Sequence, residues 1–321
     1  MLTYVVLATR STLGSKKLLI PVAVLIALPS VSAAVSLVPR KTKALIRTLL
    51  ALLVKTPGMK ISGVFLCLCF LNCVPVIALA ECGSESGELF QVARASDGDT
   101  LKLVDGRSVR VLGINAPEIT HGQKSGQPFG RESRAAAQAF VDASKGKVRL
   151  GFERESQDHY GRLLAHVYDS SGHSLAAAQL RAGMALQIAV PPNIAQAQCL
   201  AKFELTARNK SLGLWRDNYW QPLSTQSLNG NESGFRFVRG RVTKVDINSA
   251  VWLEFEGKLV ARVAKKDWPQ FVYQKSDWLA FRGKSVELRG WITSQKSRRS
   301  QQFKPLVMQL RSPSSIKVIA D

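Results

Sequence analysis

The acidic residues divide this chain sharply. All 23 Asp and Glu residues lie at or beyond position 81, whereas residues 1–80 contain nine Lys or Arg and no acidic residue. Within that stretch, Met59 is followed by Lys60, an apolar run from 64 to 79 and a small-x-small end at Ala78–Ala80, the pattern of an export signal. We therefore expect residues 59–80 to be a signal peptide and the folded protein to begin at Glu81.

Alternatives remain for this N-terminal part. The apolar run is nearly long enough to stay in the bilayer as an anchor. Residues 1–58, which hold a second apolar run, are either an over-extended gene reading or a genuine membrane segment. We expect a periplasmic or secreted protein that meets the membrane only during export. The alternatives are a membrane-anchored protein facing outward, or an envelope protein that uses basic residues on acidic polymers or lipids.

The cysteine positions bear on the same expectation. Cys67, Cys69 and Cys73 fall inside the predicted signal, which leaves Cys82 and Cys199 in the mature chain. Two cysteines in an exported protein favour one disulfide, with two unpaired thiols as the alternative.

Charge is unevenly distributed over the mature chain. Residues 81–234 carry 17 basic and 16 acidic residues, whereas residues 235–321 carry 18 and 7, a net charge of +11. Between them, Gln221–Gly234 is rich in Ser, Asn, Gln and Gly, a composition typical of flexible linkers. The sequence thus predicts a first domain at 81–220, a linker at 221–234 and a basic domain at 235–321.

Short alternating segments predict β-structure in both domains. In the first, three strand-like segments around the turn signal Asp105-Gly106 form a meander, followed by two more strands and three helices. The predicted strands are 89–95, 100–104, 107–114, 148–153 and 162–168, and the helices are 128–143, 174–181 and 194–210. The second domain has strand-like segments at 237–245, 251–255, 258–263, 285–292 and 306–310 and a helix around 266–273. The predicted fold class is α+β, mainly β, with a five-stranded barrel of the oligonucleotide-binding (OB) type followed by a second small OB-like barrel.

Four short motifs stand at loops and strand ends of the first domain. They are Asp97–Thr100 (DGDT), Arg110–Glu118 (RVLGINAPE), Asp158–Arg162 (DHYGR) and Leu212–Trp215 (LGLW). Each alone has a structural explanation, such as an Asp-Gly turn or a strand-face arginine whose stem packs while its head stays in water. In this order and spacing, they resemble the thermonuclease family, whose best known member is staphylococcal nuclease, over about residues 86–217.

The resemblance implies a chemical role for three side chains. Arg110 and Arg162 would hold the scissile phosphate and stabilise its transition state, since a guanidinium matches phosphate oxygens two at a time. Glu118 would act as general base or position the attacking water. The implied activity is calcium-dependent hydrolysis of phosphodiester bonds in DNA and/or RNA with little sequence preference, because such a site contacts phosphate rather than base edges.

The implied metal site departs from the family pattern at one position. It would use Asp99 directly, the backbone carbonyl of Ala116, and Asp97 through a water molecule. Where the family has a second ligating Asp, this chain has Asn115, which offers an oxygen without charge. Because calcium affinity depends on ligand charge, we expect weaker calcium binding or a changed metal preference. The alternative function is therefore a nuclease-like barrel that binds nucleic acid with weak or no catalysis.

Candidate substrate contacts lie in both domains. The segment Gln187–Asn193 has no tyrosine where the best known family member presents them, so Tyr160 and His159 are the candidates in the first domain. In the second domain, the basic residues Lys296, Arg298, Arg299 and Lys304 beside Trp252, Trp278 and Trp291 indicate a phosphate-tracking groove with stacking aromatics. The structural alternative is that the tryptophans belong to the core and the basic loop is simply solvated. We expect DNA and/or RNA as the partner and predict no protein partner.

Overall fold

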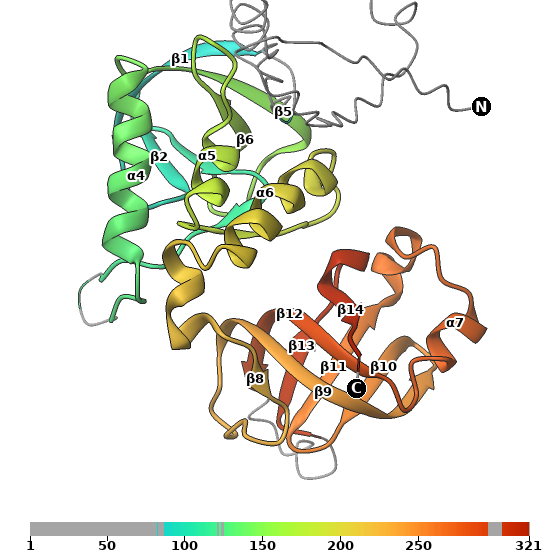
Figure 1. Ribbon diagram of the computed structural model, residues 1–321. Coiled ribbons are helices and arrows are strands. Elements are labelled where there is room, and N and C mark those ends of the chain that lie inside the picture. Colours follow the sequence, from blue (N-terminus) through green and yellow to red (C-terminus); the bar gives the residue numbers. More distant parts are fainter. Residues whose placement is uncertain (1–81, 83–86, 121, 123–124, 295–303, 321) are drawn as a thin grey trace, which may run out of the picture. The chain divides into compact units, whose positions relative to one another are not determined.

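A computed structural model describes residues 82, 87–120, 122, 125–294 and 304–320 of the chain. The predicted signal peptide and everything before it lie outside these ranges. Among the described residues, no helix combines the length and apolarity needed to cross a bilayer. The described residues from 87 onward form two β-barrels with associated helices (Figure 1).

The first barrel closes in the strand order β1-β2-β3-β6-β5. Its strands are β1 (Glu88–Ala95), β2 (Thr100–Leu103), β3 (Ser108–Val111), β5 (Lys147–Gln157) and β6 (Leu163–Tyr168). All neighbours are antiparallel except β3 and β6, which are parallel. The Asp105-Gly106 turn joins β2 to β3 as predicted, because Gly106 adopts a φ of 91° that a glycine tolerates without strain. The predicted OB-type barrel is confirmed.

Helices and a small second sheet complete this domain. The helices are α4 (Gly130–Ala143), α5 (Leu175–Arg181) and α6 (Ala197–Asn209), close to their predicted bounds. Ser174 caps α5 by accepting a hydrogen bond from the Ala177 amide at 3.2 Å. The strand expected over 107–114 is interrupted because Gly113, with a φ of 82°, turns the chain. Its remainder, β4 (Ile114–Asn115), pairs instead with β7 (Leu186–Gln187). The Cys82 and Cys199 sulfur atoms lie 1.96 Å apart, which joins the start of the described chain to α6.

The second barrel repeats the topology of the first. Its strands are β9 (Gly234–Ile247), β10 (Ala250–Phe255), β11 (Leu259–Ala264), β12 (Ser285–Ser294) and β13 (Leu306–Gln309). They close in the order β9-β10-β11-β13-β12, with the third and fifth strands parallel, and β12 pairs back to β9 over eight residues. The same order and the same single parallel pair occur in the first barrel, so the predicted second OB-like barrel is also confirmed.

Two segments of this region differ from expectation. Within Gln221–Gly234, expected to be a flexible linker, the structure places β8 (Leu223–Ser224), which pairs with β9. Thr225 there is buried because its side chain lies where a Cβ on Gly240 would stand. The helix expected around 266–273 is a 3-10 helix, η3 (Lys265–Gln270), and the α-helix follows as α7 (Lys275–Leu279). Pro269 lies inside η3 and cannot donate a backbone hydrogen bond to an α-helix.

Short elements complete the described chain. The 3-10 helices η1 (Gly213–Arg216) and η2 (Asn218–Trp220) connect α6 to the second barrel, and η5 (Pro313–Ser315) precedes the last strand, β14 (Ile316–Val318). An aromatic cluster fills the region where η1, η2 and β9 meet. Its buried members are Leu186, Ala207, Leu214, Trp215, Trp220, Phe235 and Phe237.

Two ion pairs join α6 to β12 beside this aromatic cluster. Glu204 accepts from Arg289 at 2.6 and 2.8 Å, and Glu287 accepts from both terminal nitrogens of Arg208 at 2.6 and 2.9 Å. Glu204 and Arg208 lie four residues apart on α6. Their partners on β12 lie two residues apart. Glu204 is buried and Arg289 also donates to the Gln187 carbonyl, so the pair fixes the β7 segment as well.

We predict that Arg289→Met destabilises the protein by about 3 kcal/mol, because it leaves the buried Glu204 carboxylate without its counter-charge. Urea unfolding followed by tryptophan fluorescence measures the change. The double variant Arg289→Met/Glu204→Leu should recover most of the loss, since it removes both charges. As a control, Lys244→Met breaks the exposed pair with Asp246 and should cost under about 1 kcal/mol. A double variant as unstable as the single one would contradict this account.

Candidate active site

The loop between β1 and β2 holds a buried carboxylate. Asp99 is 6% exposed, and its Oδ1 accepts from the Thr100 hydroxyl at 3.1 Å. The Asp97 carboxylate accepts from the Asp99 amide at 2.9 Å, the usual way in which an Asp closes its own turn. The predicted Asp97–Thr100 turn therefore has a second effect, which is to direct Asp99 inward.

Helices α4 and α5 fix this loop from behind. The Gln179 side-chain amide donates to the Gly98 carbonyl at 2.7 Å and to the Ser133 carbonyl at 2.9 Å, so one buried side chain ties the loop to α4. Gly98 lies so close to α4 that a Cβ there would meet the Ser133 hydroxyl at 1.8 Å and the Ala116 Cβ at 2.7 Å. No residue but glycine fits without a shift of the loop or the helix.

Arg110, on β3, is held by four acceptors. Its Nη1 donates to the carbonyls of Val111 and Ile114, both at 2.9 Å. Its Nη2 lies 3.1 Å from Asp99 Oδ2 and 3.3 Å from the Asn115 side-chain oxygen. The guanidinium is therefore fixed in position next to Asp99 and Asn115, two of the four predicted metal ligands.

The segment after β4 brings Glu118 to the same end of the barrel. The Ala116 amide donates to Asp99 Oδ2 at 2.5 Å, which fixes the backbone two residues before Glu118. The Glu118 amide and carbonyl are paired with Gln127 at 3.0 and 2.8 Å, and Gly130 lets α4 begin against the Glu118 carbonyl. The Glu118 side chain is exposed. Its backbone is thus anchored while its carboxylate faces solvent.

Arg162 is positioned by the turn that precedes β6. Its Nε donates to Asp158 at 2.7 Å, and its guanidinium lies 5.6 Å from the centre of the Tyr160 ring. Burial would raise the pKa of Asp158, but the hydrogen bonds from the Arg162 side chain and backbone outweigh it and lower the pKa, so this carboxylate stays charged. The hydrogen bond described for the Arg162 side chain uses Nε, which leaves its two terminal nitrogens for another acceptor.

Strand register explains why these residues gather. Arg110 pairs with Thr100 on one side, next to Asp99, and with Leu164 on the other, two residues after Arg162. The three adjacent strands β2, β3 and β6 therefore deliver Asp99, Arg110 and Arg162 in that order. Among the described residues, no hydrogen bond joins the Glu118 carboxylate to either arginine. The structure brings Asp99, Arg110, Asn115 and Ala116 into direct contact, with Glu118 and Arg162 beside them.

The donor set is suited to a hard cation. It consists of oxygen atoms alone, from Asp99, Asn115, Asp97 and the backbone around Ala116, which is the preference of calcium and magnesium. Burial raises the pKa of Asp99 to about 7 against the opposing effect of Arg110, with the neighbouring Asp97 adding to the rise, so its negative charge is incompletely compensated. In the described part of the chain, no three His, Cys, Asp or Glu side chains gather at one point. A cation here would therefore depend on amide and backbone oxygens as well.

The residues predicted to contact the substrate lie in several different environments. Tyr160 is 74% exposed and its ring lies 3.8 Å from that of His159, in the turn that ends at Arg162. Lys296, Arg298 and Arg299 lie outside the described residues. Lys304 donates to the carbonyls of Phe255 and Gly257. Of the three tryptophans, Trp278 belongs to the core, Trp252 is half-buried beneath Arg262, and Trp291 is 39% exposed.

Sequence reasoning missed the supporting residues. Gln179 and Ser133 lie in helices, far along the chain from the loop that they hold, and no local pattern marks them. Gly98 was noted only as part of a turn, whereas its second requirement is the close approach of α4. For Gln179, the one hint in the sequence is its place among the small and apolar residues of α5, which does not reveal its partners.

The fold and this site together define the class of protein to which the first domain belongs. A closed OB-type barrel that presents two positioned arginines, an exposed glutamate and an oxygen-only ligand set is a hydrolase domain of the nuclease type. Comparisons with known proteins agree. The family described as Staphylococcal nuclease homologue matches residues 108–217, so the second barrel lies outside the matched range. The chain belongs to the staphylococcal nuclease family.

Several relatives support this assignment. Thermonuclease of Staphylococcus intermedius is 31% identical over 133 residues, which are 40% of this chain and 77% of that protein. An uncharacterized endonuclease of Escherichia coli O157:H7 is 32% identical over 130 residues, or 40% and 76%. The SPbeta prophage-derived endonuclease YokF of Bacillus subtilis strain 168 is 34% identical over 132 residues, or 39% and 43%. The match thus spans less than half the length of the Bacillus protein.

We predict that Gly98→Ala destabilises the protein by about 1–3 kcal/mol, since the added methyl group overlaps Ser133 and Ala116. Urea unfolding gives the energy, and a crystal structure shows whether Asp99 has moved from Arg110. The control Gly230→Ala meets no atom within 4 Å and should change stability by less than about 0.5 kcal/mol. Equal stability of the two variants would show that the close approach of α4 is not needed.

Proposed function

We propose that this protein is an exported, calcium-dependent nuclease that hydrolyses the phosphodiester bonds of DNA and RNA with little sequence preference. The observation that carries the proposal is the gathering of Arg110 and Arg162, from adjacent strands, beside the buried carboxylate of Asp99. Two guanidinium groups next to an oxygen ligand set suit a phosphate, whose charge grows as a nucleophile adds.

The two arginines divide the binding of phosphate. Arg162 has its terminal nitrogens open to a phosphate, while its Nε bond to Asp158 holds the side chain in place. Arg110 is fixed by the carbonyls of Val111 and Ile114 and adds positive charge from the floor of the site. Such preorganised charge lowers the barrier because little reorganisation is needed as the reaction proceeds.

The position of Glu118 suits a general base that activates or orients the attacking water molecule. Its backbone is fixed by Gln127 and its carboxylate is free in solvent, so it can accept a proton from a water molecule that attacks phosphorus. A bond forms between the water oxygen and phosphorus, and the bond from phosphorus to one ester oxygen breaks. The leaving oxygen takes a proton from solvent, and Glu118 then releases to solvent the proton that it accepted. A calcium ion held by Asp99, Asn115 and the Ala116 carbonyl would supply further positive charge to the phosphoryl oxygens.

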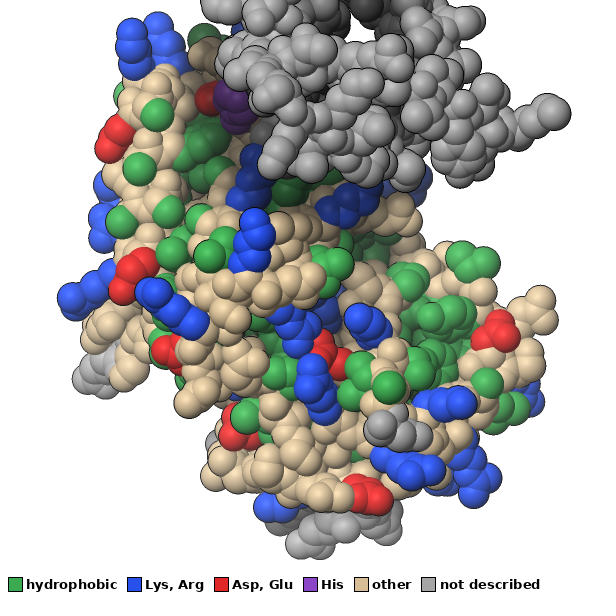
Figure 2. Space-filling model, in the orientation of Figure 1, with side chains coloured by type: hydrophobic (Ala, Val, Ile, Leu, Met, Phe, Trp, Pro, Cys, Tyr) green, Lys and Arg blue, Asp and Glu red, His purple; other side chains and the backbone are tan. Residues whose placement is uncertain are grey.

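Export is part of the proposal and is supported by the signal-like pattern at residues 59–80. In an oxidising compartment, Cys82 and Cys199 would form the disulfide for which their positions are suited. The second barrel would hold the polymer, because residues 235–321 carry a net charge of +11. Figure 2 shows Lys and Arg side chains spread over this barrel among few acidic ones.

Catalysis is tested with plasmid DNA, single-stranded DNA and RNA, with calcium and with chelator. Glu118→Gln should lower the cleavage rate by about 10²–10⁴, through loss of the proton acceptor. Arg162→Ala should lower it by about 10²–10³, through loss of transition-state charge. The matched controls Glu132→Gln on α4 and Arg154→Ala on β5 remove an exposed charge of each kind and should cleave at the wild-type rate. Tight binding without cleavage in calcium, magnesium or manganese would instead favour the nucleic-acid-binding function, for which the missing charge at Asn115 is the observation.

Asn115→Asp should strengthen calcium binding on the order of tenfold, about 1.4 kcal/mol, because it adds a carboxylate to the ligand set. Isothermal titration calorimetry with calcium measures this without reference to activity. Asn231→Asp, at an exposed position far along the chain from the site, serves as a control for added charge. Unchanged affinity in Asn115→Asp would show that position 115 is not a ligand.

A further inference from the structure

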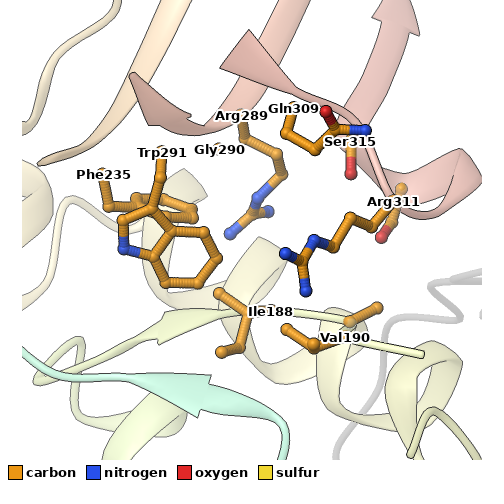
Figure 3. Close-up of a pocket in the computed structure, with 11 residues that line it drawn as sticks. Ile188, Val190, Phe235, Arg289, Gly290, Trp291, Gln309, Arg311 and Ser315 are labelled. Carbon is orange, nitrogen blue, oxygen red and sulfur yellow. The ribbon is translucent and has the colours of Figure 1, made fainter. Parts of the chain in front are cut away.

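A cleft is lined by residues of both barrels (Figure 3). Ile188 and Val190, which follow β7, form one wall. Trp291 on β12, Arg311 after β13 and the serines at 314 and 315 form the other. We call this space the inter-barrel cleft. None of the residues that the structure shows lining it is acidic.

Trp291 presents an aromatic surface to solvent on a rigid support. Its side chain points outward from β12 and is 39% exposed, whereas the residues on either side of it in the strand are buried. The indole meets the buried Phe235 ring edge-on, with the ring centres 5.0 Å apart and the planes at 82°. An exposed ring held in this way can stack on a nucleic acid base with little loss of side-chain entropy.

Arg311 supplies the free positive charge of the cleft. Arg289 also lines it, but its guanidinium is bonded to Glu204 and to the Gln187 carbonyl, so its charge is compensated. Arg311 is exposed, and no ion pair or hydrogen bond is described for its side chain. Figure 3 shows its guanidinium extending toward Ile188 and Val190, on the side of the cleft away from the Trp291 ring.

The cleft connects to the catalytic end of the first barrel through β7. Leu186 pairs with Asn115, which contacts Arg110, and the Ile188 amide donates to the Gly113 carbonyl at 2.9 Å. Ile188 follows directly after β7, so one wall of the cleft continues from the strand that pairs with Asn115. The cleft and the segment that carries Asn115 are therefore connected through a single short strand pair.

We propose that the inter-barrel cleft binds a single-stranded segment of the nucleic acid beside the cleaved phosphate, with one base stacked on Trp291 and a phosphate on Arg311. This inference rests on the proposed nuclease function and assigns the second barrel a direct part in holding the substrate. A single strand is required because a base in a duplex is already stacked on both faces and cannot lie on the indole. These two contacts do not depend on the type of sugar or on the base sequence, so the cleft accepts both DNA and RNA.

Binding is measured by fluorescence anisotropy with labelled 12-residue oligo-dT and oligo-U, in chelator, on protein that carries Glu118→Gln. Adding Trp291→Ala should weaken binding about tenfold, and Trp291→Phe should restore much of it, because stacking needs an aromatic face. Arg311→Gln should weaken binding and reduce the salt dependence by about one counterion. Arg282→Gln, an exposed arginine elsewhere on the same barrel, is the matched control and should bind like the parent. A 12-base-pair duplex should be insensitive to Trp291→Ala.

Cleavage then separates this proposal from the nuclease function on which it rests. In the otherwise wild-type protein, Trp291→Ala should reduce kcat/KM for the 12-mer more than for a dinucleotide, mainly through KM. If the wild-type protein cleaves neither substrate, the nuclease function fails, while the anisotropy data still decide whether the cleft binds single strands. If the protein cleaves both, but Trp291→Ala and Arg311→Gln leave 12-mer binding and KM unchanged, the cleft proposal is overturned. Equal losses on single strands and duplex would also overturn it.

Discussion

The buried carboxylate of Asp99 is the contact on which the site depends. One oxygen, Oδ2, receives both the Arg110 guanidinium and the Ala116 amide, so a single atom connects β3 to the segment that carries Glu118. Burying a carboxylate at this depth is costly, and the contacts with Arg110 and the Ala116 amide offset part of that cost while they also fix the segment that carries Glu118. Gln179 and the absence of a side chain at Gly98 then fix the position of Asp99 itself.

Helix α6 extends this order to the second barrel. Its buried face packs in the first domain, its Cys199 lies against Cys82, and its Glu204 and Arg208 pair with β12. Because Arg289 also binds the Gln187 carbonyl, the segment that borders the catalytic loop is held from both barrels. Contacts from the second barrel thus help to hold the β7 segment of the first.

Local signals in the sequence were enough to predict both barrels. The Asp105-Gly106 turn, the alternation in the strands and the Ser174 cap each depend on neighbouring residues, and each is found in the structure. The predicted site residues Asp99, Arg110, Asn115 and Ala116 came from motif order, and the strand register brings them together. What local patterns could not show is pairing over long separations. Glu204 and Arg289 lie 85 residues apart, and Thr225 is buried only because β8 adds to a sheet formed later in the chain.

The two arginines show how one site can use two kinds of preorganisation. Arg110 is 15% exposed and is fixed mainly by backbone carbonyls, which neither titrate nor exchange with salt. Arg162 is 34% exposed and is fixed by the carboxylate of Asp158 and the face of Tyr160. Ionic strength screens a partly exposed ion pair far more than hydrogen bonds to buried carbonyls. The position of Arg110 therefore depends little on ionic strength. The Arg162 side chain, nearer to solvent, is held through Nε, and no hydrogen bond is described for its terminal nitrogens.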